Sequence, residues 1–398
     1  MKIIYSIYHF LWAFSGSLFY RNPSKDIFVI GVTGTKGKST TLELIKSVLE
    51  EDNNKVAVMS SIRNKTPNTM PGRWEMQKFL KKAVSKNCDY ALIEVTSQGV
   101  VQHRHKFIDW DGAVFLNLHP EHIEAHGSYE KYKQAKLDFF RYLKKSNKDK
   151  KYFFVNKDDK EADDFAGTAK SIKNYQLIYF SSNDVLKITN KIKEEKDPDW
   201  LKADFNLVNA SAAMSVGIAK SVKIEKIKKA FESFDGVEGR VEYIQHKPFN
   251  VVVDYAHTPD SLKELYKNLR NSKDFTQDSK LICVLGSAGG GRDKWKRPEF
   301  GKIAASYCDT IILTSEDPYD EDPELIIEDI IKGINKDGDN NKVIKEIDRK
   351  KALKKALSLA SEGDIVVSTG MGSQKWFYSK NNKIPWKESK IIKDLLKN

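Results

Sequence analysis

The sequence predicts an α/β fold with two successive, doubly wound parallel sheets. Short apolar runs of β type alternate with helical patterns along the chain, an order typical of parallel strands joined by crossover helices. The alternation pauses at residues 237–240, where Gly239 marks a hinge, and then restarts. We therefore expect an apolar helix at residues 1–26, a first sheet domain at residues 27–239 and a second, Rossmann-like domain at residues 240–398.

The strands can be assigned from apolar runs bounded by polar or turn residues. They are expected at residues 27–32, 55–59, 90–95, 112–118, 152–155 and 177–180, and then at 249–253, 281–285, 310–313 and 365–367. Ligands of doubly wound folds bind at the carboxyl ends of the strands. Polar stretches follow the later strands at residues 254–257, 286–297, 314–323 and 369–374. We expect a ligand cleft between the two domains.

The first expected strand leads into a glycine loop with the features of a phosphate site. Residues 27–41 read IFVIGVTGTKGKSTT, so an apolar strand, a glycine turn and a helix start follow one another. Backbone N–H groups of such a loop can approach an anion, Lys38 neutralises phosphate, and the Ser39 hydroxyl can hold Mg²⁺. Val32 occupies the place of the first glycine of GxxxxGK[ST], so the spacing is irregular. We expect a P-loop ATPase-type domain whose nucleotide contacts Gly34, Thr35, Lys36, Gly37, Lys38, Ser39 and Thr40.

The composition is that of a globular protein with a basic surface. The 398 residues are 40% hydrophobic and 31% charged, with a formal net charge of +12. The excess lysine is spread over helical patterns, without an aromatic–basic module or zinc spacing, so we expect no nucleic-acid partner. Cys88, Cys283 and Cys308 form no CxxC pair. This pattern predicts free thiols in a reducing cytosol, without disulfides or structural zinc.

The first segment is strongly apolar. Residues 3–20 contain no Lys, Arg, Asp or Glu, and Lys2, Arg21 and Lys25 flank them. The segment is just short of the ~20 residues that a spanning helix needs, and a cleaved signal peptide would export the phosphate loop away from its nucleotide. Two interpretations stay open: a helix packed on the protein's own core, or an interfacial helix in peripheral membrane contact, with Trp12 at the boundary.

Three further features could carry chemistry. Glu94 ends an apolar strand and could hold Mg²⁺ near the phosphate loop, although a strand-end acid in solvent is the simpler interpretation. His119, His122 and His126 lie close together, but HxxH without a further ligand is a weak zinc pattern. Lys136 has apolar neighbours on a helical pattern, which by itself indicates a snorkelling surface lysine.

Several motifs, in order along the chain, resemble those of the Mur ligase family of ATP-dependent acid–amino-acid ligases. They are TGTKGKS at residues 33–39, EVTSQGVVQHR at 94–104, FLNLHPEHIEAHG at 115–127, the helix with Lys136, DYAHTPDSL at 254–262, GSAGGGRDKWKRP at 286–298 and SEDPYDEDP at 315–323. The resemblance runs from about residue 27 to the C-terminus. It is strongest to the branch that adds the third amino acid to a muramyl dipeptide.

The resemblance implies roles for individual residues. By this resemblance, Lys38 is expected to bind the β- and γ-phosphates of ATP. The catalytic residues are expected to be Lys38, Lys136 and His122. Mg²⁺ is expected at Ser39, Glu94 and His122, with a second Mg²⁺ positioned by a carbamylated Lys136, which replaces the surface interpretation of that lysine. Adenosine and phosphate are expected at Asn206, Asn209, Arg240 and Asp254, the acceptor at Thr69, Thr96, Gln102 and Arg104, and the incoming amino acid at Arg292, Glu316, Asp317, Tyr319 and Gln374.

The implied reaction joins a muramyl-peptide precursor to a free amino acid at the expense of ATP, with Mg²⁺ as cofactor. ATP phosphorylates the terminal carboxylate of the acceptor, and the amine of the amino acid then attacks the acyl phosphate through a tetrahedral intermediate. Mg²⁺ and lysine offset the phosphate charge, and hinge closure excludes water that would hydrolyse the intermediate.

Three departures from the family pattern bear on the substrates. Residues 1–26 stand in place of the domain that holds a UDP-sugar, so a lipid-linked acceptor or a protein partner is one hypothesis. The diaminopimelate-reading DNPR appears as EDPY at residues 316–319, and Tyr319 cannot form the bidentate contact of arginine. Nearby acidic residues make lysine or ornithine plausible beside diaminopimelate. The GKGHE-like motif reads GMGSQ at residues 370–374, which alters another amino-acid contact.

The leading hypothesis is therefore a cytoplasmic ligase of peptidoglycan precursors, with the inner face of the cytoplasmic membrane as an alternative location. A folylpolyglutamate- or cyanophycin-type ligase is an alternative that the motifs at residues 94–104 and 254–262 disfavour. A non-catalytic, membrane-apposed ATP-binding scaffold is another. The joint presence of Lys38, Glu94, His122 and Lys136 argues against it, because a scaffold needs no such set.

Overall fold

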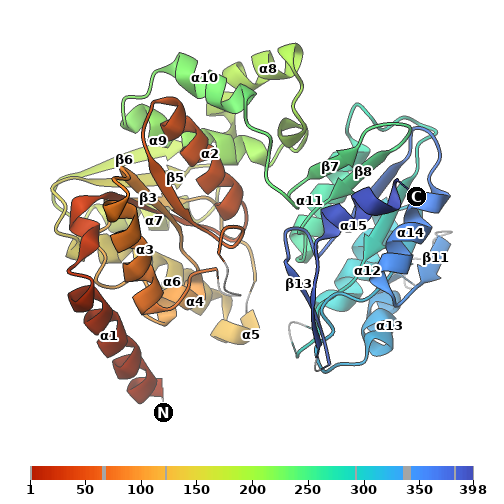
Figure 1. Ribbon diagram of the computed structural model, residues 1–398, viewed down its shortest axis with the longest axis horizontal. Coiled ribbons are helices and arrows are strands. Elements are labelled where there is room, and N and C mark those ends of the chain that lie inside the picture. The colour runs from red at the N-terminus through yellow and green to blue at the C-terminus, as the bar shows by residue number, and fades with distance from the viewer. Residues whose placement is uncertain are drawn as a thin grey trace. The chain divides into compact units, whose positions relative to one another are not determined.

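The computed structural model describes residues 2–64, 69–121, 123–291, 294–334, 342–380 and 382–397. They form two compact units, one of Met1–Leu201 with Phe205–Phe234 and the other of Lys202–Asp204 with Asp235–Asn398. Each unit has its own six-stranded sheet (Figure 1). The expected α/β class, with a parallel-sheet domain followed by a second α/β domain, is confirmed. The functional division at residues 26 and 239 stays a prediction.

The sheet of the first unit is parallel throughout, in the order β2-β3-β1-β4-β5-β6. Because β1 lies between β3 and β4, the chain leaves β1 where the strand order reverses, which is where ligands bind in doubly wound folds. The register aligns Val32 with Glu94 and Thr33 with Phe115. The strands are β1 (Phe28–Thr33), β2 (Val56–Met59), β3 (Tyr90–Glu94), β4 (Gly112–Phe115), β5 (Lys151–Asn156) and β6 (Tyr175–Phe180).

Helices cover both faces of this sheet, and successive strand residues enter two different apolar clusters. Val29 and Ile93 pack with α3, α6 and α7, whereas Ile30 and Leu92 pack with α2, α9 and α10. The helices are α1 (Lys2–Phe19), α2 (Lys38–Glu51), α3 (Arg73–Ser85), α4 (Ser97–Val101), α5 (Ile123–His126), α6 (Tyr129–Tyr142), α7 (Ala162–Ala169), α8 (Leu186–Glu195), α9 (Asn206–Ala219) and α10 (Ile224–Glu232). Short 3₁₀ turns are η1 (Pro23–Asp26), η2 (Leu143–Lys145), η3 (Ser182–Val185) and η4 (Asp199–Lys202).

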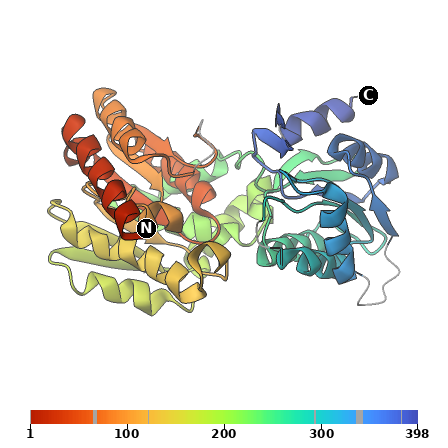
Figure 2. The same cartoon turned by 90° about the horizontal axis from the view of Figure 1, so that it is seen from below.

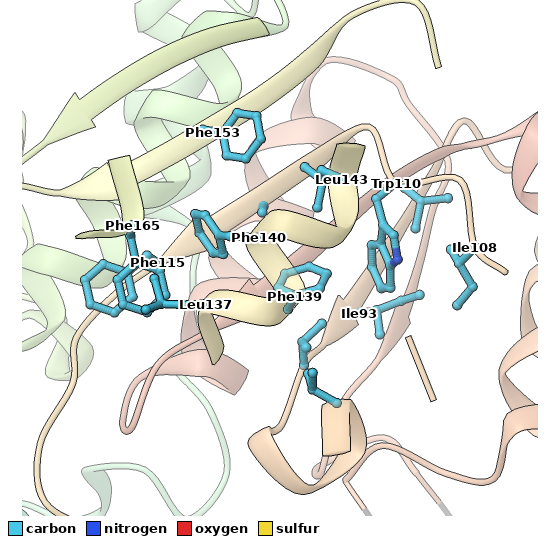
Figure 3. Close-up of a cluster of buried hydrophobic side chains, with 14 of the residues drawn as sticks. Ile93, Ile108, Trp110, Phe115, Leu137, Phe139, Phe140, Leu143, Phe153 and Phe165 are labelled. Carbon is cyan, nitrogen blue, oxygen red and sulfur yellow. The ribbon is translucent and has the colours of Figure 1, made fainter. Parts of the chain in front are cut away.

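Aromatic side chains fix helix α6 against the sheet (Figure 3). The Phe139 ring meets Trp110 edge-on at 4.9 Å between centroids, and Phe115 of β4 stacks on Phe165 of α7 at 3.7 Å. Gly31 of β1 is required beneath this layer, since a Cβ there would lie 2.3 Å from the Phe139 ring. The close approach brings α6, and with it Lys136, onto the strand that ends in the glycine loop.

The second unit has a mixed sheet in the order β11-β10-β9-β12-β8-β7, with helices on both sides (Figure 2). Only β7 runs antiparallel, pairing Glu242 with Val253. The strands are β7 (Glu242–Gln245), β8 (Asn250–Val253), β9 (Leu281–Leu285), β10 (Thr310–Leu313), β11 (Lys342–Lys345), β12 (Ile365–Ser368) and the hairpin β13 (Trp376–Ser379) and β14 (Asn382–Pro385). The helices are α11 (Pro259–Arg270), α12 (Lys296–Tyr307), α13 (Pro323–Ile334), α14 (Arg349–Leu359) and α15 (Glu388–Leu395).

The strands of the second unit were only partly predicted. The four buried strands β8, β9, β10 and β12 correspond to the apolar runs, but β7, β11, β13 and β14 were missed. These four are partly or fully exposed and contain polar residues, as in KVIK for β11. Pairing with a neighbour, rather than an apolar run, makes them strands.

The expectation that every cysteine is a free thiol is wrong. Cys283 and Cys308 form a disulfide with a Cα–Cα distance of 6.1 Å, and only Cys88 is free among the described residues. Cys283 lies within β9, and Cys308 lies two residues before the neighbouring β10, in the same apolar cluster. The pairing of β9 with β10 brings together two cysteines that are 25 residues apart, which their spacing in sequence did not indicate.

Helix α1 packs on the first unit, as one of the two interpretations of residues 3–20 expected. The Trp12 and Trp74 rings meet edge-on at 5.7 Å, and the Trp74 indole N–H donates to the Ser15 hydroxyl at 3.2 Å. Within the described residues, no helix has both the length and the apolar character needed to cross a bilayer. This packing leaves most of the large apolar side chains of α1 exposed.

Candidate active site

The loop between β1 and α2 closes around its own lysine. Gly37 has a φ of 81° at the N-cap of α2, a conformation that favours glycine. A Cβ at this position would also lie 2.2 Å from the Asn209 side-chain oxygen. The Lys38 ammonium donates hydrogen bonds to the carbonyl oxygens of Gly34 and Thr35, both at 3.0 Å. The turn places the N-terminus of α2 and a cation at the carboxyl end of β1, as an anion site needs.

An asparagine after β4 holds this loop in shape. The side-chain oxygen of Asn117 accepts hydrogen bonds from the backbone N–H groups of Thr35 (3.1 Å) and Lys36 (2.9 Å). Asn117 was not among the predicted site residues. A polar residue directly after a buried strand was the available signal, but the order of the strands was needed to place it beside β1.

Ser39 and Glu94 come together as expected. The Ser39 hydroxyl donates to Oε2 of Glu94 at 2.8 Å, and the Ser61 backbone N–H donates to the same oxygen at 3.0 Å. Ser39 and Glu94 are buried, so the interpretation of Glu94 as a strand-end acid in solvent is wrong. A carboxylate and a hydroxyl at the end of a phosphate loop are the hard oxygen ligands that suit Mg²⁺. The third expected ligand, His122, lies outside the described residues.

Lys136 is buried beneath the phosphate loop, so the surface interpretation of this lysine is wrong. Its ammonium donates to the carbonyl oxygen of Gly34 at 2.8 Å, and the Thr33 hydroxyl lies 3.4 Å away. Burial, reinforced by the positive charge of Lys38, holds the pKa of Lys136 well below its ordinary value, and Glu121 and Glu94 oppose this shift only in part. Burial thus favours the neutral, nucleophilic form of this amine over its protonated form.

Helix α9 brings its two predicted asparagines to the other side of the loop. The Thr41 hydroxyl donates to the Asn209 side-chain oxygen at 3.0 Å, and the Asn209 amide donates to Asn206 at 2.8 Å. The Asn206 amide donates in turn to the Trp200 carbonyl at 2.7 Å. Both asparagines are buried, and this chain of bonds fixes their orientation beside Gly37.

The predicted acceptor residues gather around α4. The guanidinium of Arg104 donates to the Gln102 side chain at 2.6 Å and to the Met70 carbonyl. The Thr96 hydroxyl caps α4 by accepting from the Gly99 N–H at 3.1 Å. A Cβ on Gly99 would lie 2.3 Å from the Met70 sulfur, so the segment that holds Thr69 is packed on the start of α4. The structure thus joins Gln102 and Arg104 directly and packs Met70, the residue after Thr69, on Gly99 of the helix that Thr96 caps.

In the second unit, Arg240 and Asp254 lie at one site. The Arg240 guanidinium stacks over the Tyr255 ring at 4.3 Å. The Asp254 carboxylate accepts hydrogen bonds from the N–H groups of Val241 (2.8 Å) and Ala256 (2.6 Å). Burial raises the pKa of Asp254, against the pull of Arg240. The arrangement offers a planar cation and a fixed carboxylate after β8.

The residues predicted to contact the amino acid lie after β10 and β12. Asp317 accepts hydrogen bonds from the Tyr378 N–H at 2.8 Å and from the Gln374 amide at 3.3 Å. The Tyr319 ring stacks on Tyr378 with 5.4 Å between centroids. The hairpin β13-β14 therefore holds the segment that stands in the DNPR position. Arg292 lies outside the described residues.

Glu316 differs from its neighbours because no hydrogen bond to its carboxylate is present among the described residues. Its Oε2 would lie 1.9 Å from a Cβ on Gly370, so only glycine fits there. Burial raises the pKa of Glu316 to about 8, although the nearby Arg349 opposes the shift. Arg349 itself is paired with Glu388 at 2.8 Å. Glu316 is thus a buried carboxyl group at the strand ends, available to a cationic partner.

These features define a P-loop nucleotide-binding protein with a second α/β unit. The family model of the Mur ligase middle domain matches residues 32–217, and that of the Mur ligase, glutamate ligase domain matches residues 239–372. The chain therefore belongs to the Mur ligase family, whose members are ATP-dependent ligases that form C–N bonds and use Mg²⁺.

Similar proteins agree with this membership. The chain is 34% identical over 399 residues to the "UDP-N-acetylmuramoyl-L-alanyl-D-glutamate--2,6-diaminopimelate ligase" of Syntrophomonas wolfei, covering 95% of this chain and 80% of the relative. It is 32% identical over 409 residues to the ligase of the same name from Clostridium botulinum, covering 97% and 81%. A solved structure with that name matches with a TM-score of 0.60 and 26% identity, covering 93% and 78%. The Mycobacterium tuberculosis folylpolyglutamate synthase complexed with ADP and AMPPCP shares the fold, with a TM-score of 0.70 and 13% identity over 93% and 96%.

Proposed function

We propose that this chain ligates a free amino acid to a muramyl-dipeptide precursor of peptidoglycan through an acyl phosphate. The observation that carries the proposal is the convergence of Lys38, the Ser39–Glu94 pair and the buried Lys136 at the carboxyl ends of β1 and β3. The names of the similar ligases support the acceptor. In this proposal residues 27–239 bind ATP and residues 240–398 bind the amino acid.

In the first step, a carboxylate oxygen of the acceptor attacks the γ-phosphorus of ATP, the bond to the β-phosphate oxygen breaks, and ADP is released. Gly34, Thr35, Lys36, Gly37 and Thr40 supply backbone around the phosphates, and Lys38 turns its ammonium from the loop carbonyls to the β- and γ-phosphates. Ser39, Glu94 and His122 would hold Mg²⁺, which offsets phosphate charge when bound. Thr69, Thr96, Gln102 and Arg104 orient the acceptor, with the Arg104 guanidinium suited to a carboxylate.

In the second step, the neutral amine nitrogen attacks the acyl carbon and forms the C–N bond of a tetrahedral intermediate. The C–O bond to phosphate then breaks, phosphate leaves, and the nitrogen loses a proton to give the amide. Lys38 offsets the charge that develops on the departing phosphate. Asn206, Asn209, Arg240 and Asp254 hold the adenosine and phosphate groups of the nucleotide in this proposal.

Lys136 is proposed to react with CO₂ to give a carbamate. Its low pKa supports this step, because only the neutral amine attacks the carbon of CO₂, forming the N–C bond and releasing a proton. The product carries a negative charge beneath the loop, where it can position a second Mg²⁺. The hydrogen bond to the Gly34 carbonyl would orient the remaining N–H.

The incoming amino acid is proposed to be a diamino acid. It is either diaminopimelate or an amino acid with a cationic side chain, such as lysine. Glu316 supports an amine, because it is buried without a hydrogen-bond partner among the described residues. Glu321 is less suited. Burial alone would raise the pKa of Glu321, but the N–H of Gly291 and the guanidinium of Arg297 lower this pKa to about 2. The Glu321 carboxylate is therefore already paired with donors of the protein. Asp317, Tyr319, Gln374 and Arg292 complete the proposed subsite.

We propose a cytoplasmic location for this activity, because ATP and the muramyl precursor are cytoplasmic. Peripheral contact of residues 3–20 with the inner face of the membrane, a lipid-linked acceptor and a protein partner at this surface belong to the same proposal. The exposed apolar side chains of α1 support contact with an apolar partner.

The test is a phosphate-release assay with purified full-length protein, ATP and Mg²⁺, in which UDP-linked and lipid-linked muramyl dipeptides are each combined with lysine, ornithine or diaminopimelate. We expect release that depends on both acceptor and amino acid, with a peptide product of matching mass. Lys38→Ala should abolish release while leaving the unfolding temperature unchanged. Release with a folate acceptor alone would favour a folylpolyglutamate-type ligase. ATP binding without release for any acceptor would favour a scaffold.

A further inference from the structure

Helix α1 turns its small residues toward the protein and its large apolar residues outward. Ala13, Gly16 and Ser17 are buried, and a Cβ on Gly16 would lie 3.1 Å from the Trp74 ring. Leu11 and Leu18, by contrast, are 57% and 56% exposed. The other exposed large apolar residues of the helix are Tyr5, Ile7, Tyr8, Phe10, Trp12, Phe14 and Phe19. This is the reverse of a helix in a globular core, whose apolar stripe faces inward.

The orientation of α1 is held by specific contacts rather than by apolar burial. Phe10 and Phe14 meet the Phe107 ring at 5.1 and 5.4 Å, and the Ser6 hydroxyl lies 2.8 Å from Nε2 of His103. Trp74 packs on the C-terminal half of the helix through Trp12 and Phe19. Figure 1 shows the N-terminal half of α1 extending beyond α3. The helix therefore presents a contiguous apolar face, which on a soluble protein marks an interaction surface.

Basic side chains lie beside this face, at the junction of α1, the start of α3 and the turn after α4. Burial, with Arg73 and Arg104 nearby, lowers the pKa of His9. Burial and then Lys106 lower the pKa of His103 to about 4. A pKa of about 4 leaves the His103 imidazole uncharged at neutral pH, so the cationic character of this region comes from its arginine and lysine side chains.

We define the basic cluster as Arg73 and Lys106, because Arg104 is already assigned to the proposed acceptor site. Across the described part of the chain none of its members forms an ion pair, and Asp138 is the only carboxylate that raises the pKa of any of them, that of Lys106. Arg21 and Lys25 add exposed cations at the other end of α1. Cations without an acidic partner next to an apolar face match the phosphate layer of a lipid surface.

We propose that α1 docks on a membrane surface containing anionic lipids, with its outward apolar side chains in the interfacial region and the basic cluster against lipid phosphates. A second copy of the chain fits less well, because it would bring the same cations to a surface without acids. A protein partner also fits less well, since residues 3–20 contain no charged side chain that could form the polar rim of such an interface. This docking rests on the peripheral membrane contact included in the proposed function and deepens it by naming the lipid surface, but it does not require the ligase activity.

The experiment is flotation of the full-length protein with vesicles, without ATP, acceptor or amino acid. One set of vesicles contains only phosphatidylcholine, and the other adds roughly one-third phosphatidylglycerol. We expect at least about tenfold tighter binding to the anionic vesicles, since each cation near the surface contributes about fivefold. Leu11→Glu with Leu18→Glu should weaken binding by about 100-fold or more. Arg73→Gln with Lys106→Gln should reduce the preference for anionic lipid and leave residual binding to phosphatidylcholine.

Matched controls keep these outcomes informative. Leu325→Glu changes an exposed leucine of α13, and Lys354→Gln with Lys355→Gln removes exposed cations of α14, so neither should alter flotation. Equal loss in the controls, or no binding to either vesicle, overturns the proposal. A dimer in sedimentation equilibrium that Leu11→Glu and Leu18→Glu convert to a monomer, without vesicle binding, would assign the face to a second copy. Binding of inorganic phosphate that needs Arg73, again without vesicle binding, would assign the cluster to a soluble anion.

Failure of this proposal is separable from failure of the ligase proposal. The flotation assay contains no substrate, whereas phosphate release with a UDP-linked acceptor needs no membrane. If the chain floats with vesicles but does not ligate, the docking proposal stands and the ligase proposal fails. If it ligates but does not float, the docking proposal fails and the ligase proposal stands.

Discussion

The hydroxyl of Ser39 donates a hydrogen bond of 2.8 Å to Oε2 of Glu94, joining the helix that follows β1 to the end of β3. The two residues are 55 positions apart, and the parallel pairing of β1 with β3, which aligns Val32 with Glu94, brings them together. The bond orients the two oxygen atoms that we propose as Mg²⁺ ligands. Lys38 and Lys136 both contact this loop, because each donates a hydrogen bond to the Gly34 carbonyl oxygen.

Glu94→Gln should lower ATP-dependent ligation by about 10²-fold and raise the Mg²⁺ concentration needed for half-maximal rate, because the neutral amide is a poor ligand for a hard cation. The measurement is phosphate release across a Mg²⁺ titration. Asp163→Asn, which changes an exposed carboxylate, is the control and should leave the titration unchanged. An unaltered Mg²⁺ dependence in Glu94→Gln would remove this residue from the metal site.

Lys136→Ala should abolish ligation, and the wild-type rate should fall when dissolved CO₂ is removed and recover on addition of bicarbonate. The physical reason is that burial lowers the pKa of the Lys136 amine and so favours its neutral form, which is the form that reacts with CO₂. With ¹³C-bicarbonate, a carbamate carbon resonance should appear in the wild type and in Lys131→Ala, a variant of an exposed lysine on α6, but not in Lys136→Ala. A rate that ignores bicarbonate, together with an active Lys136→Ala, would contradict the carbamate.

Glu316 should make the protein less stable as the pH rises. Burial raises its pKa from 4.5 to about 8 in the folded state, so between these values the folded chain binds more protons than the unfolded chain. The contribution is full below pH 4.5 and is lost as the pH approaches 8. It amounts to at most about 5 kcal/mol. In the protein without ligand, Glu316→Gln should flatten the dependence of the unfolding free energy on pH over this range, measured by denaturant titration.

The same carboxyl group provides a test of amino-acid choice. A cationic side chain next to Glu316 would favour its ionised form, so lysine should stabilise the wild type more at pH 8 than it stabilises Glu316→Gln. Exposed Glu324→Gln on α13 is the matched control. If lysine, ornithine and diaminopimelate all shift the unfolding temperature equally in wild type and Glu316→Gln, then Glu316 does not select the side chain of the incoming amino acid.

The buried pair of Arg349 and Glu388 should be essential for the stability of the second unit. The Arg349 guanidinium contacts the Glu388 carboxylate at 2.8 Å and donates to the Thr369 carbonyl at 2.6 Å, with both side chains almost fully buried. Arg349→Met leaves the Glu388 charge unpaired and should cost about 3–5 kcal/mol of unfolding free energy. Lys350→Met, at an exposed neighbouring position, should change it by less than about 0.5 kcal/mol. A loss in Arg349→Met no larger than that of Lys350→Met would show that the pair is not needed.

Local sequence was sufficient for the parts of the fold that depend on neighbouring residues. The phosphate loop, the buried parallel strands and α9 follow from apolar runs, glycine positions and helical periodicity, which act within a few residues. The same logic failed for the exposed strands β7 and β11, where pairing with an adjacent strand decides the conformation.

Contacts between distant segments depend on the order of the strands, which no local pattern contains. That order puts Asn117 on the backbone of the phosphate loop, and it bonds Cys283 to Cys308, against the expectation of free thiols. It also buries Lys136, which periodicity alone would have left at the surface.

The sequence by itself determined that the chain has a phosphate loop on an α/β sheet and an apolar, uncharged first segment, because these are properties of consecutive residues. Only the tertiary structure decided which side of that segment faces out, since packing against Trp74 selects Gly16 and leaves Leu11 and Leu18 exposed. In the same way, the pairing of β1 with β3 made Ser39 and Glu94 one site.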